Sequence, residues 1–392
     1  MTRRILVTDG EQRAALAVVR SLGAAGHQVF VAAESSRPLA AASRYARSGH
    51  VVPSPLEHPG QFVDALLDLC RRHGITDLWP IAEASLLAVL PERERFAGVQ
   101  IPFAAAERFR AISDKAEVLA AAEAVGIRIP RQVRLDAPAS PPAGVRFPVV
   151  LKPSRSVSGG EGRRVKTAVR YAADGTAWTK ALAAFPAEAF PVLAQERIVG
   201  PGIGIFLLLW DGRTRAVFAH RRIREKPPSG GVSVFRESVP APQELVERSR
   251  ALLERFSWQG VGMVEYKVDA ATGEPYLMEV NGRFWGSLQL AIDAGVDFPR
   301  LLLAASMGEP AGAPPACRPG VRSRWFWGDV DHLLARWRRS GEALALPPGA
   351  PGRLRTLGHF LGTFVTPGRE EIFRPSDPGP FWRESVNWIQ GR

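Results

Sequence analysis

Two carboxylates and an amide are the residues best suited to chemistry. Glu265 lies in one apolar segment, and Glu279 and Asn281 lie in the next, after the turn signal Thr272-Gly273. Alternate residues of a strand share one face, so Glu279 and Asn281 point to the same side and Glu265 can face them from a paired strand. Three hard oxygen ligands on a sheet suit Mg²⁺, which takes water and phosphate oxygens for the rest. The alternative is a solvated strand face carrying a hairpin salt bridge.

Lysine is rare in this chain, so its positions are informative. Only six of the 51 basic residues are lysine. Lys152 ends an apolar strand expected over 147–153, where a buried ammonium without a partner would be costly, so it requires an anion. Lys115 lies in the first turn of a helix expected over 113–125, where a cation is mildly unfavourable against the helix dipole. The alternative for Lys115 is an exposed first-turn residue.

A glycine-rich loop follows Lys152 directly. Residues 154–162 include Gly159, Gly160 and Gly162, which permit the dihedral angles that turn backbone N–H groups toward a phosphate. Taken alone the loop could be a flexible surface segment, but its position after Lys152 favours a lid over a bound phosphate.

The N-terminal segment predicts an open parallel sheet, because strands and helices alternate along it. Asp9-Gly10-Glu11 follows the first strand in place of the glycine fingerprint of dinucleotide-binding proteins. We therefore reject a dinucleotide site there and interpret Glu34 as an ordinary strand-end residue. The expected strands are 3–8, 28–32 and 77–81, and the expected helices are 12–25 and 60–73.

The rest of the chain predicts a mixture of hairpins and helices. The turn signal Asp211-Gly212 joins two of the strands. A region rich in proline and glycine over 309–320 reads as a linker to a tail that holds half of the ten tryptophans. The expected strands are 191–198, 203–210, 214–222, 261–269 and 275–281, and the expected helices are 171–185 and 243–256.

Four segments occur in a characteristic order. They are Asp114-Lys115 at a helix start, the strand ending at Lys152 with its glycine loop, 193–200, and 262–285 with its two glutamates. This order and spacing resembles the ATP-grasp superfamily of ATP-dependent ligases, especially its carboxylate–amine ligases, over about residues 3–305. The resemblance implies an α/β ATP-grasp fold, in which a Rossmann-like parallel-sheet domain precedes two α+β subdomains that clamp ATP. The corresponding ranges are 1–105 for the first domain, 106–200 for the small lid subdomain with its linker helix, 201–308 for the large subdomain with the metal site, and 309–392 for a Trp-rich C-terminal extension.

The resemblance also implies roles for residues around ATP. Lys152 would contact the α- and β-phosphates and Lys115 would contact them from the other side, while Gly159 and Gly160 lie in the lid. Residues 195–199 would form the hinge that reads adenine. The hinge residues that we expect to bind the nucleotide are Gln195, Glu196, Arg197 and Ile198, with Glu196 accepting from the adenine amino group. The Gly200-Pro201-Gly202 stretch departs from relatives that carry a ribose-binding acid near this position.

Metal and acyl-phosphate contacts follow from the same resemblance. Glu265 and Glu279 would hold Mg²⁺ among the triphosphate oxygens and Asn281 would complete a second ion, with Mn²⁺ as a substitute. Arg222 and Arg283 are candidates for the acyl-phosphate, because a guanidinium fork fits carboxylate and phosphate. The expected reaction is formation of an amide from small-molecule carboxylate and amine substrates, with release of ADP and phosphate.

Other readings remain open. The acceptor could be a thiol or hydroxyl, the carboxylate could be bicarbonate, or the chain could be a non-catalytic ATP-binding module. The tail tryptophans, including Trp325 and Trp327, favour packing against the core, with lining of an acceptor pocket as the alternative. We expect Cys70 and His220 to be structural.

Composition excludes other classes. The chain has 392 residues, of which 46% are hydrophobic and 23% charged, so it is neither disordered nor collagen-like. Apolar runs fall short of the roughly 18 residues of a membrane helix, and Ile5-Leu6-Val7 is too short for a signal peptide. Because Cys70 and Cys317 form no disulfide framework, we expect a cytoplasmic protein without membrane partners.

The net charge of +12 could indicate nucleic acid or anionic substrates. The arginines are spread along the whole chain, without a dense basic tail or a nucleic-acid-binding signature. We therefore expect no nucleic-acid partner, and interpret most of the charge as arginine on the surface. A homodimer is compatible with these observations.

Overall fold

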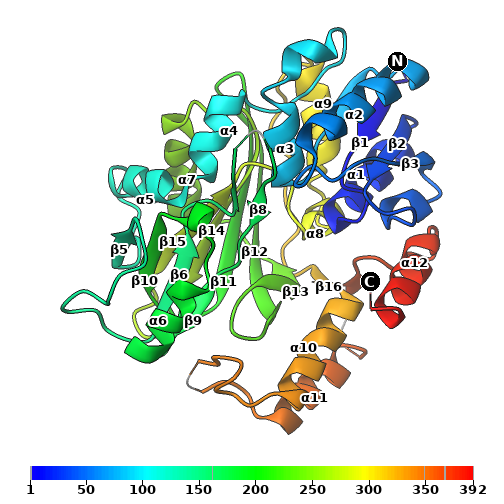
Figure 1. Ribbon diagram of the computed structural model, residues 1–392. Coiled ribbons are helices and arrows are strands. Elements are labelled where there is room, and N and C mark those ends of the chain that lie inside the picture. Colours follow the sequence, from blue (N-terminus) through cyan, green and yellow to red (C-terminus); the bar gives the residue numbers. More distant parts are fainter. Residues whose placement is uncertain (1, 161, 348, 366–367, 392) are drawn as a thin grey trace.

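A computed structural model describes residues 2–160, 162–347, 349–365 and 368–391 of the chain. It contains a parallel sheet near the N-terminus, a small antiparallel sheet, and a large sheet that the C-terminal segment extends (Figure 1). A contiguous apolar core joins the first and the large sheets, whereas the small sheet packs around its own core at Trp178. The small sheet is therefore a separate packing unit.

The N-terminal sheet has four parallel strands in the order β3-β2-β1-β4. This confirms the expected parallel sheet; β3, whose side chains alternate between half-buried and exposed, was not anticipated. Asp9 takes a positive φ of 58° and its carboxylate accepts hydrogen bonds from the backbone N–H groups of Ile81 and Ala82. The strand edge that holds a phosphate in dinucleotide-binding folds is thus occupied by the chain's own carboxylate. The elements are β1 (Arg4–Val7), α1 (Arg13–Ala24), β2 (Gln28–Ala33), β3 (Ala46–Val51), α2 (Pro59–His73), β4 (Asp77–Trp79) and α3 (Glu83–Val89), with 3₁₀ turns at Ala40–Ala42 and Arg93–Phe96.

The small sheet is antiparallel, in the order β5-β10-β6-β9. The prediction of one helix over 171–185 is wrong at its start, because Arg170–Ala172 forms the edge strand β9. The helix begins only at Gly175, where the Asp174 carboxylate caps it by accepting from the Ala177 backbone N–H. The elements are α4 (Ala106–Ser113), α5 (Lys115–Glu123), β5 (Gln132–Leu135), β6 (Val149–Pro153), β7 (Val157–Ser158), β8 (Val165–Lys166), β9, α6 (Gly175–Ala183), a 3₁₀ turn at Ala187–Ala189, and β10 (Val192–Glu196).

The large sheet has the order β15-β14-β11-β12-β13-β16-β17. The predicted turn between β11 and β12 is confirmed: Asp211 and Gly212 have φ values of 50° and 69°, the left-handed pair that a two-residue type I′ hairpin needs. The elements are β11 (Gly202–Trp210), β12 (Arg213–Lys226), β13 (Val232–Ser238), α7 (Gln243–Arg255), β14 (Gly260–Val268), β15 (Pro275–Asn281), α8 (Leu288–Asp293) and α9 (Phe298–Ser306).

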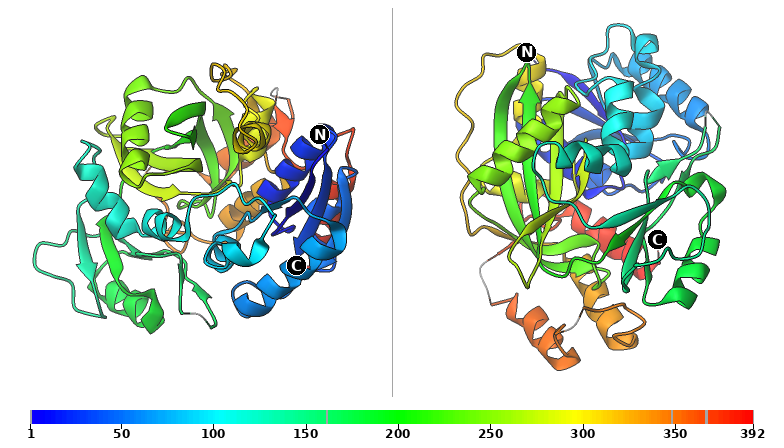
Figure 2. Two further views of the ribbon diagram at one scale, coloured as in Figure 1. Left: turned by 90° about the horizontal axis from the view of Figure 1, so that it is seen from above. Right: turned by 90° about the vertical axis from the view of Figure 1, so that its left-hand side faces the viewer.

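The C-terminal segment adds β16 (Arg322–Arg324) and β17 (Arg369–Glu370) to this sheet, and carries α10 (Phe326–Arg338), α11 (Arg353–Gly362) and α12 (Gly379–Ile389). Figure 2 shows the red α12 beside the blue N-terminal part, where Asp377 bonds the Arg20 side chain at 2.7 Å. The Trp325 ring packs under the Arg13 guanidinium, 4.0 Å from its carbon, and Trp327 stacks on Trp388. Trp325 thus packs against the N-terminal part as expected, whereas Trp327 packs within the extension.

Membrane insertion has no support in the described helices, none of which combines the length and apolar character that a bilayer crossing requires.

Candidate functional site

The two glutamates singled out from the sequence lie directly opposite each other. Glu265 in β14 pairs with Glu279 in β15. The Asn281 amide donates to Glu279 Oε1 at 3.0 Å and its oxygen accepts from Arg283 Nη2 at 2.9 Å. Arg222 from β12 reaches Glu265 Oε2 at 2.5 Å. The hairpin thus brings together the expected metal ligands and both candidate arginines.

The two carboxyl groups differ in their electrostatics. Burial raises the pKa of Glu265, and the neighbouring Glu279 carboxylate adds to this against the opposing Arg222 charge. Burial also tends to raise the pKa of Glu279, but Lys115, the Asn281 amide and Lys152 outweigh it and lower that pKa. A cation between the two carboxylates would relieve their repulsion.

Lys115 is buried, with 7% of its surface exposed, so the exposed first-turn alternative is wrong. Its Nζ donates to Ser156 Oγ at 2.9 Å and lies 3.9 Å from Glu279 Oε2. Asp114 caps the helix by accepting from the backbone N–H groups of residues 116 and 117, and also pairs with Arg155 at 2.9 Å. The helix start is thereby fixed to the segment that follows Lys152.

Lys152 approaches the same hairpin from the small sheet. In the antiparallel pairing of β6 with β10, Lys152 lies opposite Leu193. The Lys152 Nζ lies 3.9 Å from Met278 Sδ. Burial lowers the pKa of Lys152 to about 8, with Glu279 opposing that shift. Lys152 and Lys115 therefore flank Glu279 from two different elements, as a polyphosphate site requires.

The glycine loop folds into the short β7–β8 hairpin. Gly159 has a φ of 119°, and a Cβ there would lie 2.7 Å from the Arg163 carbonyl oxygen, so only glycine fits without strain. The Arg164 backbone N–H donates to the Leu56 carbonyl at 2.7 Å, which ties the loop to the N-terminal part. Gly159 and Gly160 line a cavity of about 590 Å³ together with residues of α3 and α4.

The hinge residues make contacts that the sequence did not reveal. Gln195 is buried and donates to the Gln132 side chain at 2.9 Å, while its own Oε1 has no partner within the described residues. Glu196 Oε1 already accepts from the Arg131 backbone N–H at 3.0 Å. Arg197 donates to the Ala345 carbonyl in the C-terminal extension at 2.5 Å, and Ile198 is buried. The hinge is therefore in direct contact with the extension.

The glycines after the hinge have a steric explanation. A Cβ on Gly200 would lie 1.8 Å from the Val268 carbonyl oxygen, and one on Gly202 would lie 2.8 Å from the Arg222 Cδ. Larger residues, including an acid, cannot occupy these positions without moving β14 or Arg222. The close approach of neighbouring strands thus explains why glycines stand here, where relatives carry a ribose-binding acid.

Arg222 and Arg283 have different surroundings. Arg222 bonds Glu225 at 2.8 Å and the Gly231 carbonyl at 2.9 Å, in addition to Glu265, so it supports the loop that connects β12 and β13. Arg283 donates to Asn281 and to the Phe284 carbonyl. Arg222 therefore contacts Glu265 directly, whereas Arg283 is linked to Glu279 through Asn281.

Sequence reasoning missed Glu83, the first residue of α3. Burial raises its pKa, with Glu279 adding to the shift and with Arg283 and Lys115 opposing it. Those interactions place Glu83 at the same cluster from the N-terminal part. Its position just beyond the carboxyl end of strand β4 was the available signal, since ligands of open α/β sheets bind at that edge.

The two structural assignments hold. His220 is buried with both ring nitrogens unpartnered among the described residues, and burial lowers its pKa well below the ordinary value. Burial raises the pKa of Cys70 to about 12. Neither is suited to proton transfer or nucleophilic attack.

The donor set fits Mg²⁺ bound jointly with a phosphorylated substrate. Within the described ranges no three His, Cys, Asp or Glu side chains gather into a complete metal site. Glu265 and Glu279 with the Asn281 oxygen provide a partial set of hard oxygens, and Mg²⁺ takes waters and substrate phosphates for the remainder. A structural metal site would instead be closed by protein ligands alone.

Comparison with known proteins agrees with this geometry. Residues 188–328 match a family described as ATP-grasp in the biosynthetic pathway with Ter operon. No curated protein matches the sequence.

Solved structures share the fold at low sequence identity. An L-amino acid ligase from Bacillus licheniformis is 16% identical with a TM-score of 0.64, over 82% of this chain and 78% of that one. The N5-carboxyaminoimidazole synthetase of Staphylococcus aureus, in complex with ADP, is 12% identical with a TM-score of 0.61, over 82% of each chain. The biotin carboxylase domain of 2-oxoglutarate carboxylase from Hydrogenobacter thermophilus, crystallised with MgADP and bicarbonate, is 17% identical with a TM-score of 0.59, over 82% of this chain and 73% of that one.

Proposed function

We propose that this chain, an ATP-grasp protein by fold and by its family match, is an ATP-dependent ligase that joins a carboxylate to an amine. The observation that carries the proposal is the convergence of Lys115 and Lys152 on Glu279, beside the paired carboxylate of Glu265. Cations for a triphosphate and carboxylates for its metal thus meet in one place, supplied by four elements, α5, β6, β14 and β15.

The residues divide the work by charge. Lys115 and Lys152 would neutralise the phosphates of ATP, with the β7–β8 loop covering them and the hinge 195–198 holding adenine. Glu265, Glu279 and Asn281 would hold Mg²⁺, which neutralises charge on the phosphate oxygens when it is bound. The catalytic contribution is positioning and electrostatic stabilisation, for which no nucleophilic side chain is needed.

The reaction has two transfers. A carboxylate oxygen of the first substrate attacks the γ-phosphorus, the bond to the β-phosphate oxygen breaks, and ADP leaves. The amine nitrogen then attacks the acyl carbon, the bond to phosphate breaks, and the amine proton passes to solvent. Arg283 would stabilise the acyl-phosphate, because its guanidinium is held at the glutamate pair by Asn281.

An ADP-release assay over pairs of amino acids and peptides tests the proposal. We expect ADP and phosphate release that requires both a carboxylate and an amine, with an amide product detected by mass. Glu279→Gln should reduce the rate by at least about 100-fold, since it removes a metal ligand and a phosphate-site charge. Glu247→Gln is the matched control, because that glutamate is exposed on α7.

The other outcomes separate the alternatives. ADP release that depends on bicarbonate alone would favour a carboxylase, as in one of the similar structures. Nucleotide binding without turnover on any pair would favour a regulatory ATP-binding module. Full activity in Glu279→Gln would show that the site is misassigned.

A further inference from the structure

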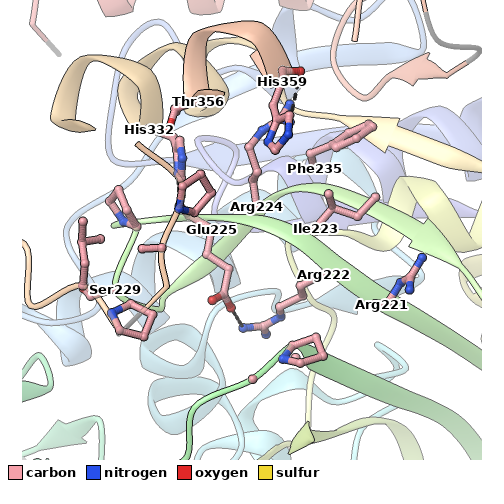
Figure 3. Close-up of a pocket in the computed structure, with 18 of the residues that line it drawn as sticks. Arg221, Arg222, Ile223, Arg224, Glu225, Ser229, Phe235, His332, Thr356 and His359 are labelled. Atoms are coloured by element: carbon pink, nitrogen blue, oxygen red, sulfur yellow. Dashed lines mark hydrogen bonds and ion pairs between the residues drawn. The ribbon is translucent and has the colours of Figure 1, made fainter. Parts of the chain in front are cut away.

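A large cavity lies where the hinge, the large sheet and the C-terminal extension meet. It encloses about 840 Å³ and is bounded by residues 197–202, the end of β12, part of β13, and residues of α10 and α11. Figure 3 shows the Arg222 and Glu225 side chains of β12 directed to one side of the strand, and Arg224 directed to the other side, toward His359 of the extension, with His332 and Thr356 nearby. This volume is typical of a small-molecule site.

The lining of this cavity is strongly basic. Glu225 and Glu237 are the two carboxylates of the lining, against seven cationic side chains. The cations are Arg197, Arg221, Arg222, Arg224, Lys267, Arg322 and Arg336.

Carboxylates are too few to neutralise these cations singly. Glu237 is shared between Arg221 at 2.9 Å and Arg322 at 3.0 Å. Asp329 lies behind Arg224 and pairs with it at 2.7 Å, but it also serves Arg324 at 2.8 Å. Glu237 and Asp329 thus each serve two guanidinium groups, whereas Arg222 pairs with both Glu225 and Glu265. Arg197, Lys267 and Arg336 line the cavity without a carboxylate partner among the described residues, so positive charge is left over.

Arg336 is the clearest case of an uncompensated charge. It is only 8% exposed, it donates to the Pro351 carbonyl, and the described part of the chain provides no carboxylate for it. Burial lowers its pKa, and Arg353 nearby lowers it further. Arg336 therefore presents a guanidinium to the cavity without an opposite charge, and such a group suits an anion that binds there.

The cavity adjoins the candidate active site at Arg222. Arg222 lines it and also bonds Glu265. Lys267, two residues after Glu265 on β14 and thus on the same face, lines it as well. Arg197 joins it to the hinge and to the extension at Ala345. A ligand held here would lie next to Arg222, which contacts Glu265.

We propose that this cavity binds a small-molecule substrate that carries at least two oxyanion groups, either carboxylates or phosphates, with Arg336 holding the end remote from the glutamate pair. The identification of the ligand as a substrate rests on the proposed ligase function. The proposal that the cavity binds a polyanion is independent of that function. The C-terminal extension is then a specificity element that completes the pocket.

Calorimetric titration of the full chain with citrate and with fructose 1,6-bisphosphate tests this, with triethyl citrate as the uncharged control. Titrations are run with and without ADP, because ADP would fill the phosphate site at Lys115 and Lys152 and the hinge edge of the cavity at Arg197 and Ile198, but not the end at Arg336. We expect binding of at least one anion that persists with ADP, and no binding of the triester. Arg336→Gln should weaken it at least about tenfold, in line with loss of a charge-assisted contact, whereas Arg338→Gln, exposed on the same helix, should leave it unchanged.

The titrations with citrate and with the bisphosphate identify which anionic group binds, and they separate the polyanion proposal from the proposed nucleotide site. Binding of citrate alone indicates a polycarboxylate, binding of the bisphosphate alone a phosphorylated substrate, and binding of both a general polyanion site. If Arg336→Gln fails to fold, Lys267→Gln serves in its place with the same expectation. No anion binding, or equal affinity in these variants, overturns the inference even if ADP binds; anion binding without ADP binding would instead refute the nucleotide site.

Discussion

Nucleotide binding should be coupled to protonation of Lys152. Burial lowers its pKa to about 8, so a phosphate bound beside it should raise that pKa back toward the ordinary value near 10.4. The difference corresponds to about 3 kcal/mol of interaction in favour of the charged form. The sign is therefore proton uptake on binding, over the interval between the two pKa values.

The magnitude follows from the two titration curves. With those pKa values, ADP binding should take up about 0.9 proton near pH 9 but only about 0.1 near pH 7. The dissociation constant for ADP should rise about tenfold from about pH 7 to about pH 9. Calorimetry of ADP binding without added metal, in buffers of different ionisation enthalpy, measures the uptake directly. Lys152→Met should bind weakly without uptake, and Lys180→Met, exposed in the same subdomain, should behave as the parent. Equal uptake in Lys152→Met and the parent would refute the reasoning.

Three further predictions concern the framework of the molecule. Glu371→Gln should lower the free energy of unfolding by about 3–5 kcal/mol in urea denaturation, because it leaves the fully buried Arg236 without its partner; an unchanged midpoint would contradict this. Gly200→Ala should cost about 3 kcal/mol, since the added Cβ overlaps a carbonyl oxygen at 1.8 Å, whereas Gly60→Ala, in open space, should stay within about 0.5 kcal/mol. Cys70, with its pKa raised to about 12, should hold roughly a thousandfold less thiolate near pH 8 than an ordinary cysteine, and rapid alkylation of the native protein there would contradict that.

The sequence was informative where spacing along one strand or turn determines the outcome. Glu279 and Asn281 share a face because strands alternate, and Asp211-Gly212 forms its hairpin because both residues tolerate a positive φ. Asp114 caps its helix with a carboxylate, as its residue type indicates. These features depend on local geometry alone.

The sequence could not reveal contacts made across the fold. Glu83 reaches the site from helix α3 of the N-terminal part, and Arg197 contacts Ala345 almost 150 residues away. Lys226 at the end of β12 forms an ion pair with Asp331 of the extension. Such pairs depend on how distant elements dock, and one sequence carries no record of that.

The interpretation of the arginines as surface charge was wrong for a defined group of them. Arg20 is 7%, Arg236 0%, Arg324 4% and Arg336 8% exposed. A guanidinium can be buried more readily than an ammonium, because its charge is delocalised and several N–H groups can be satisfied by carbonyls and carboxylates at once. Arg20 illustrates this by donating to three backbone carbonyls as well as to the Asp377 carboxylate.

Three of these buried arginines act as structural joints and one does not. Arg20 and Arg236 pair with carboxylates of the extension, and so connect it to the rest of the chain. Arg324 pairs with Asp329 within the extension. Arg336 has the same burial but no carboxylate among the described residues, and it faces the 840 Å³ cavity instead of a packed interface. If the buried arginines served only to hold the extension in place, we would expect Arg336 to pair with a carboxylate as the other three do. A substrate anion bound in the cavity would provide the opposite charge that Arg336 lacks.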